Sequence, residues 1–236
     1  MRFLSTASRL PAIFSVMALA GCATLSSFQE ARTVEKGKGR LHIAATDYSA
    51  LVRESSGFED PKGAFVFDIG ARVGIIDKLD IGLNYSIPAS ATGDVKYMFT
   101  SRESKFAFSS GLKAGYMNYE LEFSDSSGTT AKARTPTIID VGIPLYATVY
   151  PLNWLSLTAS PHATYRTVIG AWMTAGPILG VNGNLKIGKN GGVLVEGGFH
   201  KAMESGGPYF INYSAAVFFP ISLGFEDLVK DAAKNL

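Results

Sequence analysis

Cysteine is nearly absent from this chain of 236 residues, which contains only Cys22. One cysteine excludes an intramolecular disulfide and a cysteine-rich zinc site. Charge is also sparse: Asp, Glu, Lys and Arg make up 18% of the residues, the net charge is +2, and Lys and Arg form no cluster. Binding to nucleic acid is therefore not expected. No run of 18 apolar residues follows Cys22, so no transmembrane helix is predicted there.

What is present at the start of the chain is a secretory signal. Arg2 and Arg9 precede a short apolar stretch, LPAIFSVMALAG, that ends directly before Cys22. A basic start, an apolar run too short to span a membrane and small residues before the break are typical of signal peptides.

The residues LAGC at 19–22 also resemble the lipobox of bacterial lipoproteins. This resemblance implies that residues 1–21 are removed and that Cys22 is acylated. Ala23 in the following position implies sorting to the outer membrane. The alternative is an ordinary signal peptide that is cleaved nearby.

Two flanking segments differ from the central region. Residues 22–39 are polar without a sustained period, and we expect a lipidated N-terminal tether there. The final stretch, FEDLVKDAAKNL, places apolar residues at helical spacing, with acids early and lysines late. That charge order suits the helix dipole, so we expect a short periplasmic amphipathic helix over residues 221–236.

The central region alternates between apolar and polar residues with a period of two. In LDIGLNYSI (79–87), the residues at odd positions are all apolar or aromatic, and those between them are polar or glycine. This period is typical of a strand whose two faces meet different environments. Ten such segments occur, at 40–48, 63–76, 79–87, 94–100, 105–117, 135–149, 154–166, 173–187, 192–201 and 208–220.

The residue types decide which face meets water. The apolar phase of these segments carries no charge, whereas the opposite phase combines small and polar residues with balanced charges. A narrow polar lumen favours this composition, because an unpaired ion inside it is costly. We therefore predict an inward-facing charge network made of Asp68, Arg72, Asp80, Lys96, Lys113, Asp140, Lys186 and Glu196.

The connections between segments alternate in length. Tight turns such as IDK and GKNGG alternate with mostly longer polar connections. Residues 40–220 thereby resemble a small bacterial outer-membrane β-barrel, with short periplasmic turns and longer external loops. The resemblance implies an all-β, membrane-spanning, antiparallel up-and-down barrel of about ten strands. An even strand number places both chain ends on the periplasmic side, where a lipid on Cys22 would meet the inner leaflet.

Three prolines, Pro144, Pro161 and Pro177, lie inside predicted strands. Each proline removes a backbone donor, and a closed barrel has no free edge where that loss is harmless. We therefore expect bulges or shorter strands around these positions.

A catalytic site can be drawn from inward-facing residues. Ser160 and His162 share one face of a strand, and pairing around the PLN turn would bring Asp140 near His162. Outer-membrane lipid A deacylases use a serine and a histidine in the barrel wall, but their His-x-Ser order is reversed in SPH here. A histidine held in a polar hydrogen-bond network is the alternative.

Other chemistry has less support. Glu196, His200 and His162 follow no metal-site spacing, so we expect no metal and no cofactor. The Asp-x-Asp and Asp-x-His stretches that mark the omptin proteases are absent.

The sequence therefore predicts a lipid-anchored outer-membrane barrel that is not an enzyme, with a structural, surface-binding or narrow-transport role and a largely occluded lumen. Its expected partners are outer-membrane lipids and the outer-membrane assembly machinery. Two alternatives stay open: an outer-membrane esterase or lipid A-modifying hydrolase that uses Ser160, His162 and Asp140, and a soluble periplasmic lipocalin-like binding lipoprotein.

Overall fold

The computed structural model describes residues 25–51, 53–54, 57–58, 62–87, 90–118, 120–124, 130–134, 137–169, 176–204, 207 and 209–222. The expected signal peptide (1–21) and the expected lipidation site, Cys22, lie outside these residues. So does most of the expected C-terminal helix, residues 223–236. No helix in the described part of the chain is long and apolar enough to cross a membrane.

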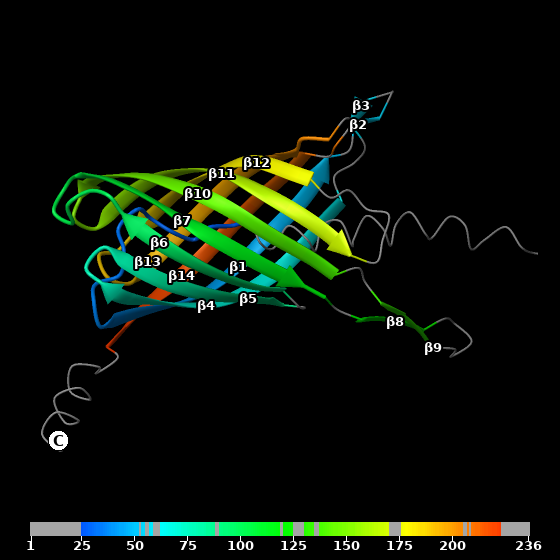
Figure 1. The fold of residues 1–236 in the computed structure, drawn as a ribbon, viewed down its shortest axis with the longest axis horizontal. Helices are drawn as coiled ribbons and strands as arrows, with labels where there is room; N and C mark the ends of the chain where they lie inside the picture. The colour runs from blue at the N-terminus through cyan, green and yellow to red at the C-terminus, as the bar shows by residue number, and fades with distance from the viewer. Residues whose placement is uncertain are drawn as a thin grey trace, which may run out of the picture.

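Ten strands form a closed barrel in which neighbours pair in antiparallel fashion (Figure 1). Each strand pairs with its sequence neighbours in the barrel, and the first pairs with the last, from Lys38 opposite Ser222 to Leu51 opposite Tyr209. This topology confirms the predicted fold class. The strands are β1 (Lys38–Leu51), β4 (Lys62–Ile76), β5 (Leu79–Ile87), β6 (Ser90–Met98), β7 (Phe106–Met117), β10 (Thr137–Leu152), β11 (Leu155–Ile169), β12 (Gly176–Ile187), β13 (Gly192–Ala202) and β14 (Tyr209–Ser222).

The two ends of the barrel differ. At one end, the turn end, the strands are joined by residues 77–78, 99–105, 153–154 and 188–191. The opposite end, the loop end, carries two small hairpins that extend beyond the barrel (Figure 1). They are β2–β3 (Arg53–Glu54 and Gly57–Phe58) and β8–β9 (Glu120–Ser124 and Thr130–Arg134). The barrel's first strand begins, and its last strand ends, at the turn end.

The outer wall is apolar and the inner wall is polar. In the stretch LDIGLNYSI, Leu83 is 64% exposed on the outside, whereas Asp80 and Ser86 are buried inside. The other strands repeat this pattern, with exposed outward-facing residues such as Phe65, Ile69, Leu112, Ile143, Val181 and Val217. A soluble lipocalin-like domain needs a polar outer wall, so that alternative does not fit this surface, which suits contact with lipid.

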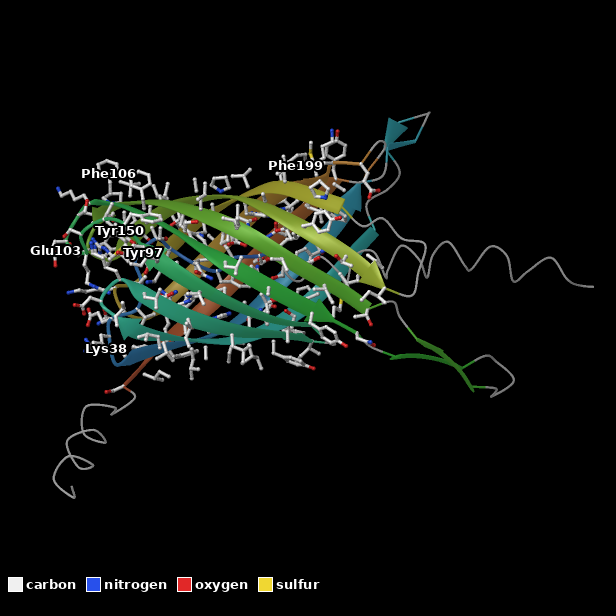
Figure 2. All side chains as sticks on the ribbon, in the orientation of Figure 1. Lys38, Tyr97, Glu103, Phe106, Tyr150 and Phe199 are labelled. Carbon is white, nitrogen blue, oxygen red and sulfur yellow. The ribbon has the colours of Figure 1, made fainter. Side chains whose placement is uncertain are left out.

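Aromatic side chains mark the two borders of the apolar wall. Tyr97 and Phe106 lie at the turn end, and Phe199 lies near the loop end (Figure 2). The ten residue-to-residue steps from Phe106 to Tyr116 along β7 rise about 33 Å, which is about 25 Å across a membrane at the usual strand tilt of 35–45°. This height matches the apolar band of outer-membrane barrels.

The prolines do not shorten the strands. The register of β10 with β7 pairs Gly142 and Leu145 but no residue between them, so Pro144 lies in a local gap of the ladder. Pro161 and Pro177 keep register partners in the neighbouring strand. Of the two expected adjustments, bulges or shorter strands, the structure shows a local irregularity of the ladder at Pro144.

Candidate functional site

The lumen is occupied by the chain's own N-terminal segment, residues 25–36, which we call the N-terminal plug. Its side chains as far as Val34 are buried or half-buried inside the barrel: Leu25 is 2% exposed, Phe28 is 3% exposed and Ala31 is fully buried, whereas Glu35 and Lys36 are exposed at the turn end. Residues 22–39 were expected to form a lipidated tether, and within the described part of that range residues 25–34 lie inside the barrel. The plug is therefore the central feature of the interior.

Near the loop end, Leu25 joins an apolar cluster on the inner wall. Asn182 donates a hydrogen bond from Nδ2 to the Leu25 carbonyl oxygen at 2.8 Å. The Ser26 hydroxyl lies 2.7 Å from the Tyr48 hydroxyl and 3.4 Å from that of Ser214. Leu25 packs with Tyr48, Val66, Ile178, Ala202 and Phe210.

In the middle of the barrel, the Glu196 carboxylate binds the plug. It accepts hydrogen bonds from the Ser27 backbone N–H at 3.0 Å, the Ser27 hydroxyl at 2.5 Å and the Phe28 N–H at 3.1 Å. Lys113 donates from Nζ to the Ser26 carbonyl oxygen at 2.8 Å. A carboxylate and an ammonium of the wall thus satisfy the backbone of the plug, which has no strand partner there. Hydrogen bonds to charged groups are the stronger kind.

Phe28 adopts an unusual backbone conformation, with φ at 45°. The left-handed region costs a bulky residue about 1–2 kcal/mol, so the surrounding contacts must hold it in place. The Phe28 ring lies 5.5 Å from the His42 ring, centroid to centroid, and packs in a buried cluster with Ala44, Leu194, Ala216 and Phe218. Burial of this ring therefore holds Phe28 in its left-handed backbone conformation.

Toward the turn end, Glu30 of the plug meets cations of the wall. Its carboxylate lies 2.9 Å from Lys186 Nζ and 3.4 Å from Arg40 Nη1, and it accepts a hydrogen bond from the Ser156 hydroxyl at 3.1 Å. Lys96 donates from Nζ to the Glu30 carbonyl oxygen at 2.8 Å. The buried charge of the plug is therefore compensated by cations that the wall supplies.

The plug leaves the lumen at the turn end. The Val34 N–H donates to Asp80 Oδ2 at 2.8 Å, and Arg102 donates from Nη1 to the Thr33 carbonyl oxygen at 2.9 Å. At the mouth, the Lys38 ammonium donates a hydrogen bond to Glu35 and lowers the pKa of that carboxyl. The chain then turns directly into β1.

Little space remains between plug and wall. The cavities found inside the lumen have volumes of about 30 and 10 Å³, each large enough for only one or two water molecules. A larger cavity of about 300 Å³ lies at the turn end and is lined by Arg32, Arg40, Arg102, Lys186 and Lys189 among others. The described residues therefore leave no wide passage through the barrel.

The structure places the predicted charge network on the inner wall in separate groups. Arg72 pairs with Asp80 and with Asp94, and Lys96 Nζ lies 3.7 Å from Asp80. Asp68 accepts hydrogen bonds from the hydroxyls of Ser86 and Thr46 and from the Asn84 amide instead of from a cation. Lys113, Lys186 and Glu196 bind the plug. Some of the wall charges thus pair with each other, whereas Lys113, Lys186 and Glu196 bind the plug.

Sequence reasoning missed four charged partners in this interior: Asp94, Arg166, Arg40 and Glu30. Asp94 and Arg166 stand at the ends of predicted segments in the inward phase, so the alternation alone could have identified them. Glu30 lies in the plug, where the sequence has no periodic signal.

The structure does not assemble the candidate catalytic triad. The register places Arg166 opposite Asp140, and the two side chains form a bidentate pair at 2.8 and 2.7 Å. His162 Nε2 lies 3.1 Å from Nδ1 of His200. The Ser160 hydroxyl is buried and has no hydrogen-bond partner among the described residues. The expected proximity of Asp140 and His162 was wrong, because it assumed a different register around the turn.

The candidate metal ligands are also engaged elsewhere. His200 Nε2 lies 2.7 Å from the Asn212 side-chain oxygen, and Glu196 binds the plug. Within the described residues, no group of three or more His, Cys, Asp and Glu side chains is placed to hold a metal ion.

No protein-family model matches the sequence, and no curated protein matches it. Solved structures match the chain at low identity. Neisserial surface protein A is 14% identical with a TM-score of 0.36, over 77% of this chain and 96% of that one. An outer-membrane channel from Pseudomonas putida F1 is 11% identical with a TM-score of 0.45, over 82% and 100%. The outer-membrane protease OmpT of Escherichia coli is 8% identical with a TM-score of 0.34, over 78% and 94%. Similarity this low indicates nothing about activity.

Proposed function

We propose that this protein is a non-enzymatic outer-membrane barrel that its own N-terminal plug seals, and that it serves as a structural anchor for the loops at the loop end. The observation that carries the proposal is the continuous set of contacts between plug and wall. Leu25, Ser27, Glu30 and Val34, in chain order, each contact the wall, from the loop end to the turn end.

The charges of the interior support a sealed lumen rather than a transport path. An open channel needs polar groups that face water, whereas here Glu196, Lys113 and Lys186 are occupied by the plug. A barrel of this size encloses little more than its own side chains, so one extra chain segment fills it. The apolar wall described above supports insertion in the outer membrane.

The lipobox supports a second attachment to the membrane through an acyl group on Cys22. One acylated residue alone gives only weak membrane binding, but a barrel of ten strands holds the protein in place. Under this proposal the barrel, and not the acyl group, is what mainly keeps the protein in the membrane. The outer-membrane lipids and the outer-membrane assembly machinery are its proposed partners.

Conductance in planar lipid bilayers tests the sealed lumen. The full-length protein should give little or no stable conductance, because the plug leaves no continuous water path. A variant in which residues 25–34 are replaced by Gly and Ser of equal number should conduct steadily, because those side chains no longer fill the lumen.

The control for this experiment is a folding assay in detergent on both proteins, so that only closed barrels are compared. Steady conductance of the unaltered protein would contradict the proposal. So would a folded replacement variant that stays closed, because the plug would then not be what blocks the lumen.

A further inference from the structure

We propose that the plug carries the N-terminal side of the mature chain to the loop end, so that an acyl group on Cys22 enters the outer leaflet on the cell surface. This inference rests on the proposed lipid anchor, and it places that anchor in the outer leaflet instead of the inner leaflet. The sequence alone had suggested a periplasmic N-terminus.

The direction of the plug is given by the order of its contacts. Leu25 packs beside Tyr48 and Phe210, close to the loop ends of β1 and β14. Lys36 forms a bridge to Gly74, and the Gly37 N–H donates to the Gly74 carbonyl oxygen at 3.0 Å, both at the turn end. The chain thus crosses the barrel as the plug and crosses it again in the opposite direction as β1.

The reach of the chain then limits where Cys22 can lie. Cys22 precedes Leu25 by three residues, and three fully extended residues span at most about 11 Å. The turn end lies about 25 Å from the loop end across the apolar band. Cys22 therefore cannot return to the turn end while Leu25 keeps its place.

The lumen also excludes the acyl group. The cavities within it, of about 30 and 10 Å³, hold a water molecule or two and no acyl chain. Removal of each methylene group from water is favourable, so the acyl group must reach hydrocarbon. The nearest hydrocarbon to the loop end is the leaflet that meets that rim. Because long loops face outward in barrels of this kind, that leaflet is the outer one.

Single cysteines on intact bacteria test the side of the N-terminus. Thr24→Cys reports on the N-terminal side, Asn118→Cys reports on the loop end, and Glu103→Cys reports on the turn end, where Asn118 and Glu103 are exposed. A membrane-impermeant maleimide should label Thr24→Cys and Asn118→Cys on intact cells. It should label Glu103→Cys only after the outer membrane is permeabilised. The unaltered protein is the control for reaction of Cys22 itself.

Labelling of Thr24→Cys only after permeabilisation, together with Glu103→Cys, would overturn the inference. Protection of both Thr24→Cys and Asn118→Cys on intact cells would overturn the assignment to the cell surface.

A disulfide lock keeps the inference testable if Thr24→Cys fails to react under either condition. Ser26 and Ser214 have hydroxyl oxygens 3.4 Å apart, so the double variant Ser26→Cys/Ser214→Cys should form a disulfide on oxidation. The cross-link should alter the mobility of the denatured protein on a non-reducing gel. A folded barrel that forms no cross-link would overturn the inference that the plug passes through the lumen to the loop end.

Mass spectrometry of the N-terminal peptide separates this inference from the proposed lipid anchor. Acylated Cys22 with Thr24 on the periplasmic side would contradict the inference alone. An unmodified N-terminal peptide, together with labelling of Thr24→Cys on intact cells, would contradict lipidation but would leave the path of the plug through the barrel unchanged.

Discussion

At the residue scale, Leu83 and Asn84 show that adjacent side chains meet different media. Leu83 is 64% exposed on the outer wall. Asn84 faces the lumen, where its amide nitrogen donates to Asp68 at 3.1 Å and its oxygen lies 3.0 Å from His42 Nε2. A substitution at each position therefore tests a different interaction.

Leu83→Arg should lower the free energy of unfolding in lipid vesicles by about 2–4 kcal/mol, because it places a charge in hydrocarbon near the middle of the bilayer. Urea titration of the protein in vesicles measures the change. Leu83→Val is the matched control and should cost less than about 1.5 kcal/mol. Equal effects of arginine and valine would mean that lipid does not contact this position.

At the element scale, the plug and β4 meet at one close approach. A Cβ on Gly74 would lie 2.2 Å from the Glu35 carbonyl oxygen and 2.5 Å from that of Val34. These are backbone atoms, which cannot rotate away, so the glycine is needed for the plug to enter β1. Gly183 in β12 is the opposite case, since nothing lies within 4 Å of an added Cβ there.

Gly74→Ala should therefore lower the free energy of unfolding by about 1–3 kcal/mol through overpacking against the plug. Gly183→Ala, the same change in another strand, should leave it unchanged or raise it by about 0.5 kcal/mol. Chemical unfolding followed by tryptophan fluorescence compares the two variants. If both glycines tolerate alanine equally, the plug does not pass Gly74 as described.

The same elements explain how far the sequence could predict the structure. All ten predicted segments correspond to barrel strands, because a wall between lipid and a polar lumen imposes a strict period of two. The plug has no such period, since its residues bond to several different strands of the wall. Its partners are remote in sequence: Ser27 and Glu196 are 169 residues apart. The triad failed for a related reason, because the partner of Asp140 depends on the register and not on the alternation.

At the scale of the whole molecule, ring closure makes β1 and β14 neighbours through fourteen register pairs, from Lys38 with Ser222 to Leu51 with Tyr209. A closed ring has no exposed edge strand, and the plug adds contacts across its interior. Disruption by detergent therefore requires many interactions to break together.

We expect the protein to run at a different mobility in SDS before and after boiling, because the closed barrel resists the detergent until heated. Ala215→Pro, in the strand that closes the ring, should lower the temperature of this shift, because it removes a ladder donor where no free edge exists. Gel electrophoresis over a temperature series measures both. Identical mobility before and after boiling would contradict a closed barrel.

The threaded plug also imposes an order in time on biogenesis. Residues 25–36 are made before any of the strands that finally surround them, yet they contact β13 and β14, which are made last. Either the plug stays without its wall contacts until the ring closes around it, or it enters the closed barrel afterwards together with the acyl group on Cys22. The side of the membrane on which the N-terminus lies is therefore determined when β1 pairs with β14 and closes the ring.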